Sequence, residues 1–152
     1  MNIAMEHVFP VSREQLWTVL LDPARLANCI PGCEKLEEVG PDSYAATLKV
    51  GVGAIQGTYA GKVEIAEKQF PAHYRLSVEG RSAPGFLRGL ASVDLSERAD
   101  GATRLSLNGE AQVGGLIASV GQRFLSGIAR QMVEQLFTNI ERELQVSPEG
   151  RG

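Results

Sequence analysis

The sequence predicts an α+β fold in which a curved antiparallel sheet of about six or seven strands wraps around one long C-terminal helix. Between residues 43 and 113, apolar and polar side chains alternate with the period of two that is typical of strands with one buried face. From residue 116 to about residue 145, apolar side chains recur at spacings of three and four, as on one face of a helix. Such a helix would be about 45 Å long, so a twisted sheet must curl around it to bury its apolar stripe.

A short strand and the first of two short helices precede this sheet. Residues 2–9 are rich in apolar side chains, and Pro10 ends the strand that they predict. Ser12 and Gln15 have the spacing of a capping box, which predicts a helix that begins after Ser12. Leu16, Trp17, Leu20 and Leu21 recur along it at helical spacing.

A second short helix follows at once. Asp22 and Pro23 form the cap and first position of this helix, because aspartate accepts hydrogen bonds from free helix N–H groups and proline suits the first turn. Pro31 and Gly32 end the segment, since proline interrupts the helical hydrogen bonds and glycine tolerates the exit turn.

Five further strands are predicted from the alternation, and Pro, Gly and Asp residues mark the turns between them. Short turns favour antiparallel pairing, with one face on a core and one in water. We expect one domain over residues 1–146 and a flexible C-terminal tail over residues 147–152. The predicted strands span residues 43–50, 58–67, 73–80, 86–96 and 103–113.

Composition excludes several classes of function. With 152 residues, 43% of them apolar, the chain is long enough to bury a core without disulfides or a structural metal. The formal charge of −3 provides no basic excess for nucleic acid. No signal peptide or membrane-spanning run is apparent, so we expect a cytoplasmic protein. We also expect no metal and no cofactor.

Candidate catalytic residues are few. Cys29, Cys33 and several serines are candidate nucleophiles, with His7 and His73 as possible bases, but both histidines are interpreted as structural or solvated side chains. His73 lies on the polar face of its strand, and His7 lies far away along the chain, in the first strand. Cys29 and Cys33 lack the second ligand pair of a zinc site and are interpreted as reduced thiols. For Cys33, packing beneath the loop is favoured over a thiol at the mouth of a cavity, because Lys35, its one cationic neighbour in the sequence, points the other way if the chain is extended there.

The inward face of the predicted sheet carries many small side chains. Many of its positions are Gly or Ala, which indicates a hollow between sheet and helix. The alternative is that the helix approaches closely at these positions and fills the space. Tyr44, Tyr59 and Tyr74 also face inward, and a buried tyrosine hydroxyl needs a partner that a ligand carbonyl could supply.

Several motifs resemble one known family. The runs Leu21-Asp22-Pro23, Ile30-Pro31-Gly32-Cys33-Glu34 and Gly114-Gly115-Leu116-Ile117-Ala118 resemble the family of the carbon monoxide dehydrogenase G subunit, which belongs to the START-like, or SRPBCC, superfamily. The motif residues are Asp22, Pro23, Pro31, Gly32, Cys33, Gly114 and Gly115.

The resemblance implies a helix-grip fold with a deep hydrophobic cavity and no fixed catalytic constellation. It also implies a role beside molybdenum hydroxylases of the carbon monoxide dehydrogenase type, either in membrane recruitment or in handling a lipophilic electron acceptor such as a quinone. Longer family members carry an apolar C-terminal segment, whereas this chain ends soon after the predicted helix, so at most transient contact with the inner face of the membrane is expected.

The sequence therefore predicts a non-enzymatic accessory protein that binds a quinone-like or lipid molecule. Two alternatives are an enzyme of the aromatase, cyclase or hydrolase type, and an assembly factor that docks a partner without ligand through Trp17 or the acidic residues 34–38. Phe86 is expected to gate the mouth, and Phe124→Ala and Tyr59→Phe to weaken binding. The expected ligand-binding residues are Tyr44, Leu48, Tyr59, Val63, Tyr74, Phe86, Leu105, Leu107, Ile117, Val120, Phe124 and Ile128.

Overall fold

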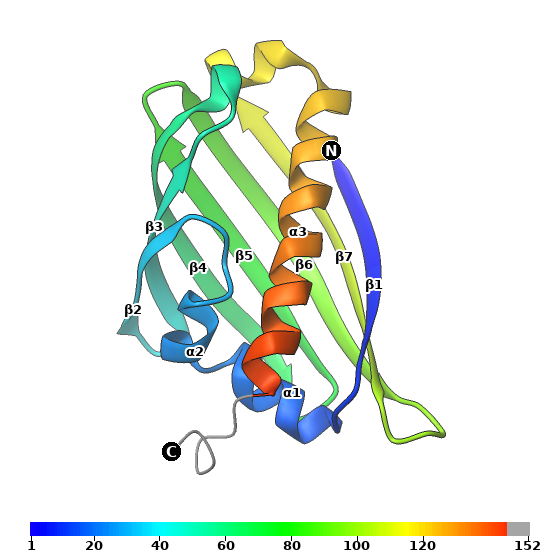
Figure 1. The fold of residues 1–152 in the computed structure, drawn as a ribbon. Helices are drawn as coiled ribbons and strands as arrows, with labels where there is room; N and C mark the ends of the chain where they lie inside the picture. The colour runs from blue at the N-terminus through cyan, green and yellow to red at the C-terminus, as the bar shows by residue number, and fades with distance from the viewer. Residues whose placement is uncertain (146–152) are drawn as a thin grey trace.

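The alternating segments pair into one antiparallel sheet of seven strands. The computed structural model describes residues 1–145, and the predicted tail over residues 147–152 lies outside them. The strand order is β1-β7-β6-β5-β4-β3-β2, so the first strand pairs with the last (Figure 1). The strands are β1 (Asn2–Phe9), β2 (Cys33–Gly40), β3 (Ser43–Val50), β4 (Gly57–Gln69), β5 (His73–Ser82), β6 (Gly85–Glu97) and β7 (Thr103–Gly114).

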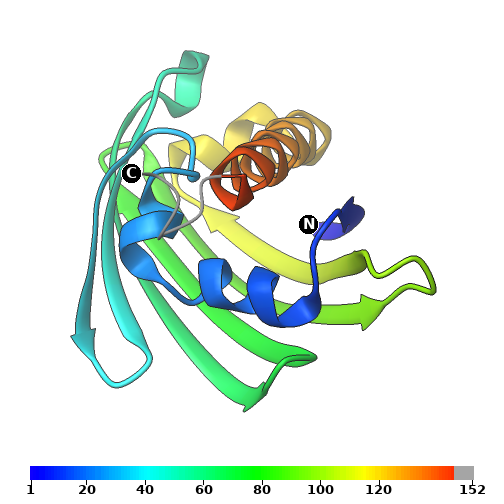
Figure 2. The same cartoon turned by 60° about the horizontal axis from the view of Figure 1, so that its bottom comes forward.

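Helices cover the concave face and one end of this sheet. Figure 2 shows the sheet curving around α3 (Gln122–Leu144), with α1 (Arg13–Leu20) and α2 (Pro23–Ala27) closing one end. Two short 3₁₀ helices, η1 (Gly53–Ile55) and η2 (Leu116–Val120), lie at the other end. This is the α+β architecture that the sequence predicts.

The predicted helix caps are confirmed. The Ser12 side chain accepts a hydrogen bond from the Gln15 backbone, and the Gln15 side chain accepts one from the Ser12 backbone, which completes the capping box of α1. Asp22 Oδ1 accepts hydrogen bonds from the N–H groups of Ala24 and Arg25, at 3.1 and 3.4 Å. The caps therefore fix where both short helices begin.

Two elements differ from the sequence prediction. Strand β2 was not predicted, because Cys33–Gly40 is an edge strand with mostly exposed side chains and two register irregularities, and so shows no alternation. The long helix was predicted from residue 116 but begins at Gln122. Gly121, with φ of 96°, separates η2 from α3, so Ile117 and Val120 belong to a different element from the rest of the stripe.

The hydrophobic core is concentrated at the end that carries α1. Phe9 of β1 meets Phe137 of α3 edge to face, with 5.9 Å between ring centroids. Trp17 of α1 packs in the same way on Tyr74 of β5, at 5.5 Å. Among residues 1–145, no helix combines the length and the apolar character needed to cross a bilayer.

Candidate functional site

An apolar cavity of about 220 Å³ lies between the sheet, the two short helices and the C-terminal half of α3. All of its lining side chains are apolar except for two tyrosine hydroxyls. They are Leu20, Leu21, Pro23, Leu26, Ile30, Leu36, Tyr44, Val63, Ile65, Tyr74, Leu76, Val78, Val93, Leu105, Leu107, Leu136, Phe137 and Ile140.

The cavity exists because the central strand is not fully covered. Leu76 and Val78 lie on the inner face of β5, in the middle of the sheet, yet both remain only partly buried. The aromatic pairs Phe9–Phe137 and Trp17–Tyr74 pack α3 and α1 against the sheet, and Phe137 and Tyr74 also line this space. The curvature of the sheet and the bulk of these rings therefore leave apolar surface facing a hollow.

Two tyrosines, Tyr44 and Tyr74, are the polar residues among those that line the cavity. Tyr74 is 4% exposed, and within the described residues neither its hydroxyl nor that of Tyr44 makes a hydrogen bond. Burial raises the pKa of both phenols, and the nearby Glu38 and Asp42 carboxylates raise the pKa of Tyr44 further. Both hydroxyls are therefore neutral near pH 7 and can donate to a carbonyl group of a ligand.

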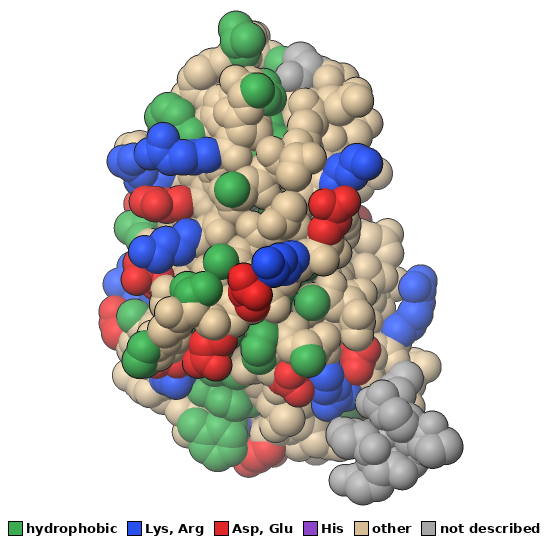
Figure 3. All heavy atoms as spheres, turned by 90° about the vertical axis from the view of Figure 1, so that its left-hand side faces the viewer, with side chains coloured by type: hydrophobic (Ala, Val, Ile, Leu, Met, Phe, Trp, Pro, Cys, Tyr) green, Lys and Arg blue, Asp and Glu red, His purple; other side chains and the backbone are tan. Residues whose placement is uncertain are grey.

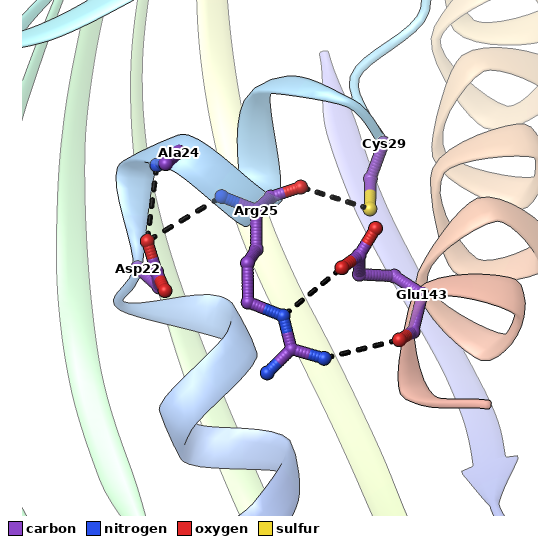
Figure 4. A network of polar contacts seen from close by, with 5 residues as sticks. All are labelled: Asp22, Ala24, Arg25, Cys29 and Glu143. Carbon is purple, nitrogen blue, oxygen red and sulfur yellow. Dashed lines mark hydrogen bonds and ion pairs between the residues drawn. The ribbon is translucent and has the colours of Figure 1, made fainter. Parts of the chain in front are cut away.

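A half-buried ion pair fastens one wall of the cavity to another (Figure 4). Arg25 of α2 donates from Nε to a carboxylate oxygen of Glu143 and from a terminal nitrogen to the Glu143 carbonyl, both at 3.0 Å. Asn139 Nδ2 donates to the carbonyl of Cys29, at 2.9 Å. These bonds position α2 and the following loop against the last turns of α3, so the walls keep a fixed separation.

The cavity is smaller than the sequence led us to expect. Ligand pockets typically enclose about 300–1,000 Å³, whereas this one encloses about 220 Å³. The difference arises because Phe137 and Ile140 of α3 fill part of the hollow. The space suits a single substituted ring rather than an entire isoprenoid lipid.

Five of the expected ligand-binding residues line the cavity, namely Tyr44, Val63, Tyr74, Leu105 and Leu107. The structure places the others elsewhere: three lie on strands, two on η2 and two on the first half of α3, which extends beyond the cavity. The residues outside the lining are Leu48, Tyr59, Phe86, Ile117, Val120, Phe124 and Ile128.

The positions of these outlying residues have local causes. Leu48 pairs with Tyr59 near the η1 end of the sheet, and the Tyr59 hydroxyl donates to the Ile55 carbonyl at 2.7 Å. Phe86 is on the outer face of β6, where Arg88 lies 6.0 Å from its ring centroid, so it is not placed to gate the cavity. Phe124, on the first turn of α3, is 45% exposed.

Sequence reasoning overlooked the wall formed by the short helices. Leu20, Leu21, Leu26 and Ile30 were recognised as apolar helix faces but were assigned to packing alone. Leu36 belongs to the strand that the sequence did not reveal. The signal available for this wall was the apolar face of each short helix, since such a face must cover something.

The glycines of the family motifs have structural roles in this chain. Gly32 has φ of 75°, and a Cβ there would meet the carbonyl oxygen of Lys49, whose N–H donates to the Gly32 carbonyl at 2.8 Å. Gly115 has φ of 80° and crosses the chain at Gly85, where a side chain would not fit. The motif glycines therefore permit close backbone crossings that hold the α2–β2 loop and η2 in place.

The histidines lie outside the cavity lining. His7 Nε2 lies 3.1 Å from a carboxylate oxygen of Glu141, and His73 Nδ1 lies 2.8 Å from one of Asp94. Within residues 1–145, no group of three His, Cys, Asp or Glu side chains is arranged to hold a metal ion. The described cavity lining contains no acidic, basic or thiol side chain.

The two thiols differ in environment and should differ in reactivity. Burial raises the pKa of Cys29 to about 11, and the pKa of the half-buried Cys33 is also raised by burial. At pH 8 the higher pKa leaves about a hundredfold less thiolate at Cys29 than at an ordinary thiol. We expect iodoacetamide to label Cys33 in the folded protein and to label Cys29 only after unfolding, as read by mass spectrometry.

A Cys33→Ser variant provides the control, because its one remaining thiol should stay unlabelled until denaturant is added. Rapid labelling of this variant in the folded state would contradict the buried position of Cys29.

The raised pKa of Cys29 also determines how the stability of the protein depends on pH. Since the unfolded chain releases this proton near pH 9, the contribution of Cys29 to stability is complete below pH 9 and is lost as the pH rises toward 11.

One known family matches nearly the whole chain that forms this fold and cavity. The model of the carbon monoxide dehydrogenase G subunit (CoxG) family matches residues 6–145. The chain belongs to this family. No match is found among curated protein sequences.

Solved structures share the fold of this CoxG-family chain. A conserved protein from Geobacillus kaustophilus is 35% identical, with 95% of each chain covered and a TM-score of 0.92. A START superfamily protein from Mycobacterium smegmatis is 11% identical over 96% of this chain and 99% of that one, with a TM-score of 0.75. The fold is therefore the START-like helix-grip fold, and the family match supports a ligand-binding protein of the SRPBCC type.

Proposed function

We propose that this chain binds the ring of a quinone-like molecule in its apolar cavity and acts as a non-enzymatic accessory protein of a carbon monoxide dehydrogenase-type molybdenum hydroxylase. The observation that carries the proposal is the pair of tyrosine hydroxyls, at Tyr44 and Tyr74, without hydrogen-bond partners among the described residues in an otherwise apolar lining. A quinone ring presents apolar edges and carbonyl acceptors, which match this lining.

The size of the cavity supports a ring as the buried part. A volume of about 220 Å³ suits one substituted ring, and an attached apolar chain would have to extend past the partly exposed side chains of Ile30, Leu36 and Leu136. The absence of acidic, basic and thiol groups from the described lining favours binding over acid–base chemistry. The family description is the basis for proposing the molybdenum hydroxylase as the partner.

The assembly-factor alternative receives less support from the surface. Trp17, one of its two candidate contacts, is only 9% exposed and packs against Phe70 and Tyr74. Glu34 and Glu38 are exposed on the edge strand β2 and remain available to a partner, whereas the exposed Glu37 pairs with Lys35. Ligand-independent capture of the hydroxylase by purified protein would favour this alternative.

Removing the tyrosine hydroxyls tests the ligand directly. We expect Tyr44→Phe and Tyr74→Phe each to weaken binding of a short-chain ubiquinone analogue about two- to twelvefold, because a hydrogen bond contributes about 0.5–1.5 kcal/mol net. Trp17 is the one tryptophan of the chain and lies 5.5 Å from Tyr74, centroid to centroid, so quenching of its fluorescence reports binding.

Tyr59→Phe is the matched control, because the Tyr59 hydroxyl is used by the Ile55 carbonyl and lies outside the lining. Its affinity for the quinone should equal that of the wild type. Equal weakening by all three substitutions would argue against the assigned roles of Tyr44 and Tyr74. Native mass spectrometry of protein purified gently from a quinone-producing host, followed by extraction, then identifies the natural ligand.

A further inference from the structure

The end of the molecule opposite α1 and α2 forms one continuous surface, which we call the tip. It consists of residues 49–58 with η1, residues 80–88 at the β5–β6 hairpin, and residues 112–124 with η2 and the start of α3 (Figure 1). The Ile117 N–H donates to the Pro84 carbonyl at 2.9 Å, which joins η2 to the hairpin. Because η1 also contacts η2, the three segments lie against one another.

Large apolar side chains are exposed on this tip. Val52 is 41% exposed, Phe124 is 45% exposed and Leu116 is 73% exposed, the highest value among the large apolar side chains of the described residues. The exposure of Leu116 is imposed by the backbone, because η2 buries the adjacent Ile117 and so turns Leu116 outward. The side chains project from the loop before η1, from η2 and from the first turn of α3, and none of them lines the cavity.

The charge of the tip is opposite to that of the whole chain. Its three segments contain Lys49, Arg81, Arg88 and Arg123 and no Asp or Glu. The remaining 11 basic and 18 acidic residues leave the rest of the chain with a formal charge of −7. In Figure 3 the charged side chains nearest the upper end of the molecule are basic, and acidic ones begin below them.

Three of the four cations of the tip are uncommitted. Within the described residues, Lys49, Arg81 and Arg123 make no ion pair, whereas Arg88 pairs loosely with Glu79, at 3.9 Å. Toward the opposite end, many basic side chains already contact a carboxylate. These pairs are Arg25–Glu143, Lys35–Glu37, Lys68–Asp42, Arg75–Glu67, Arg98–Asp100 and Arg104–Glu6.

We propose that the tip docks on an anionic lipid bilayer. Apolar side chains on a rigid end can enter the boundary between head groups and acyl chains, while unpaired cations beside them contact lipid phosphates. The net charge of −3 does not attract the whole molecule to an anionic membrane. The separation of charge along the molecule, however, orients the basic tip toward such a surface. The cavity lies toward the other end of α3, so this inference does not depend on the ligand that the cavity binds.

Flotation of the full chain with phosphatidylcholine vesicles, with and without phosphatidylglycerol, tests the proposal. We expect binding only to the vesicles that contain phosphatidylglycerol, weakened by added salt. Leu116→Ser with Phe124→Ser, and separately Arg81→Gln with Arg123→Gln, should each reduce the bound fraction about tenfold. Leu90→Ser with Arg98→Gln is the control, since Leu90 is 51% exposed on the outer face of β6 and Arg98 lies at the other end.

A labelled cysteine provides a second measurement that does not depend on the folding of the double variants. In a Cys33→Ser background, an environment-sensitive fluorophore at Leu116→Cys should shift to the blue on addition of anionic vesicles, and one at Leu90→Cys should not. Failure of the wild type to float, or equal effects of tip and control substitutions, would overturn the proposal. A fluorophore at Leu116→Cys that shifts with a partner protein but not with vesicles would assign the tip to a protein interface instead.

Discussion

Val78→Phe is expected to reduce the affinity for a short-chain quinone about a hundredfold or more. Val78 lies on the central strand, lines the cavity and is only partly buried, so a phenyl ring there occupies the space of the ligand. Each apolar side chain of a ligand-binding surface contributes about 1.5–3 kcal/mol when fully buried, and loss of about 3 kcal/mol corresponds to a hundredfold. Quenching of Trp17 fluorescence measures the loss.

The same variant should remain folded. Filling a cavity commonly stabilises a protein by about 0.5–2 kcal/mol, and overpacking costs about 1–3 kcal/mol, so the free energy of unfolding should stay within about 2 kcal/mol of wild type. Val39→Phe is the matched control, because Val39 is 57% exposed on β2 and outside the lining. Unchanged affinity in Val78→Phe, or in the second lining variant Leu76→Trp, would show that the ligand binds elsewhere.

Gly32→Ala should destabilise the protein by about 3 kcal/mol or more. Left-handed backbone costs a residue with a Cβ about 1–2 kcal/mol, and at Gly32 the added carbon also meets the carbonyl oxygen of Lys49 on β3. Relief of this overlap requires the loop after α2 to move away from β3, which breaks the hydrogen bond from the Lys49 N–H. Urea denaturation followed by circular dichroism measures the change.

Gly101→Ala separates the two contributions. Gly101 also has a positive φ, of 88°, but nothing lies within 4 Å of the position that its Cβ would take. This control should lose only the conformational part, about 1–2 kcal/mol. If Gly32→Ala lowers the free energy of unfolding no more than Gly101→Ala does, the motif glycine is not needed for the close crossing.

Together these two substitutions assign different tasks to neighbouring parts of the fold. Ile30 contributes to the lining, and Gly32, two residues later, fixes the loop against β3. The Pro31-Gly32-Cys33 motif therefore fixes the position of the cavity wall and does not itself line the cavity. On this basis Gly32→Ala should weaken quinone binding only in proportion to the unfolded or displaced fraction.

Local rules were sufficient for most of the secondary structure. Ser12 and Asp22 mark helix starts because their side chains satisfy free N–H groups whatever lies beyond. The predicted strands over residues 43–50 and 103–113 correspond closely to β3 and β7, because one buried face imposes the period of two. Strand β2 escaped this rule, since an edge strand with exposed side chains on both faces has no such period.

The candidate site depended on information that no local pattern contains. The resemblance and the small inward side chains indicate a hollow, and the inward alternation placed Tyr44 and Tyr74 on the correct face of the sheet. The position of the hollow along the sheet depends on where Phe9, Phe137 and Trp17 pack between the helices and the sheet. For this reason Phe124 and Ile128, on the same stripe as Ile140, lie beyond the cavity.

The sequence alone therefore determined the element order, the inward and outward faces and the family, because caps, alternation and motif glycines act within a few residues of the chain. The tertiary structure decided which inward residues surround the cavity, how large it is, and that Val52, Leu116 and Phe124 are all exposed at one acid-free end. These properties depend on the curvature of the sheet and the seating of α3, which arise from packing between residues that are distant in the sequence.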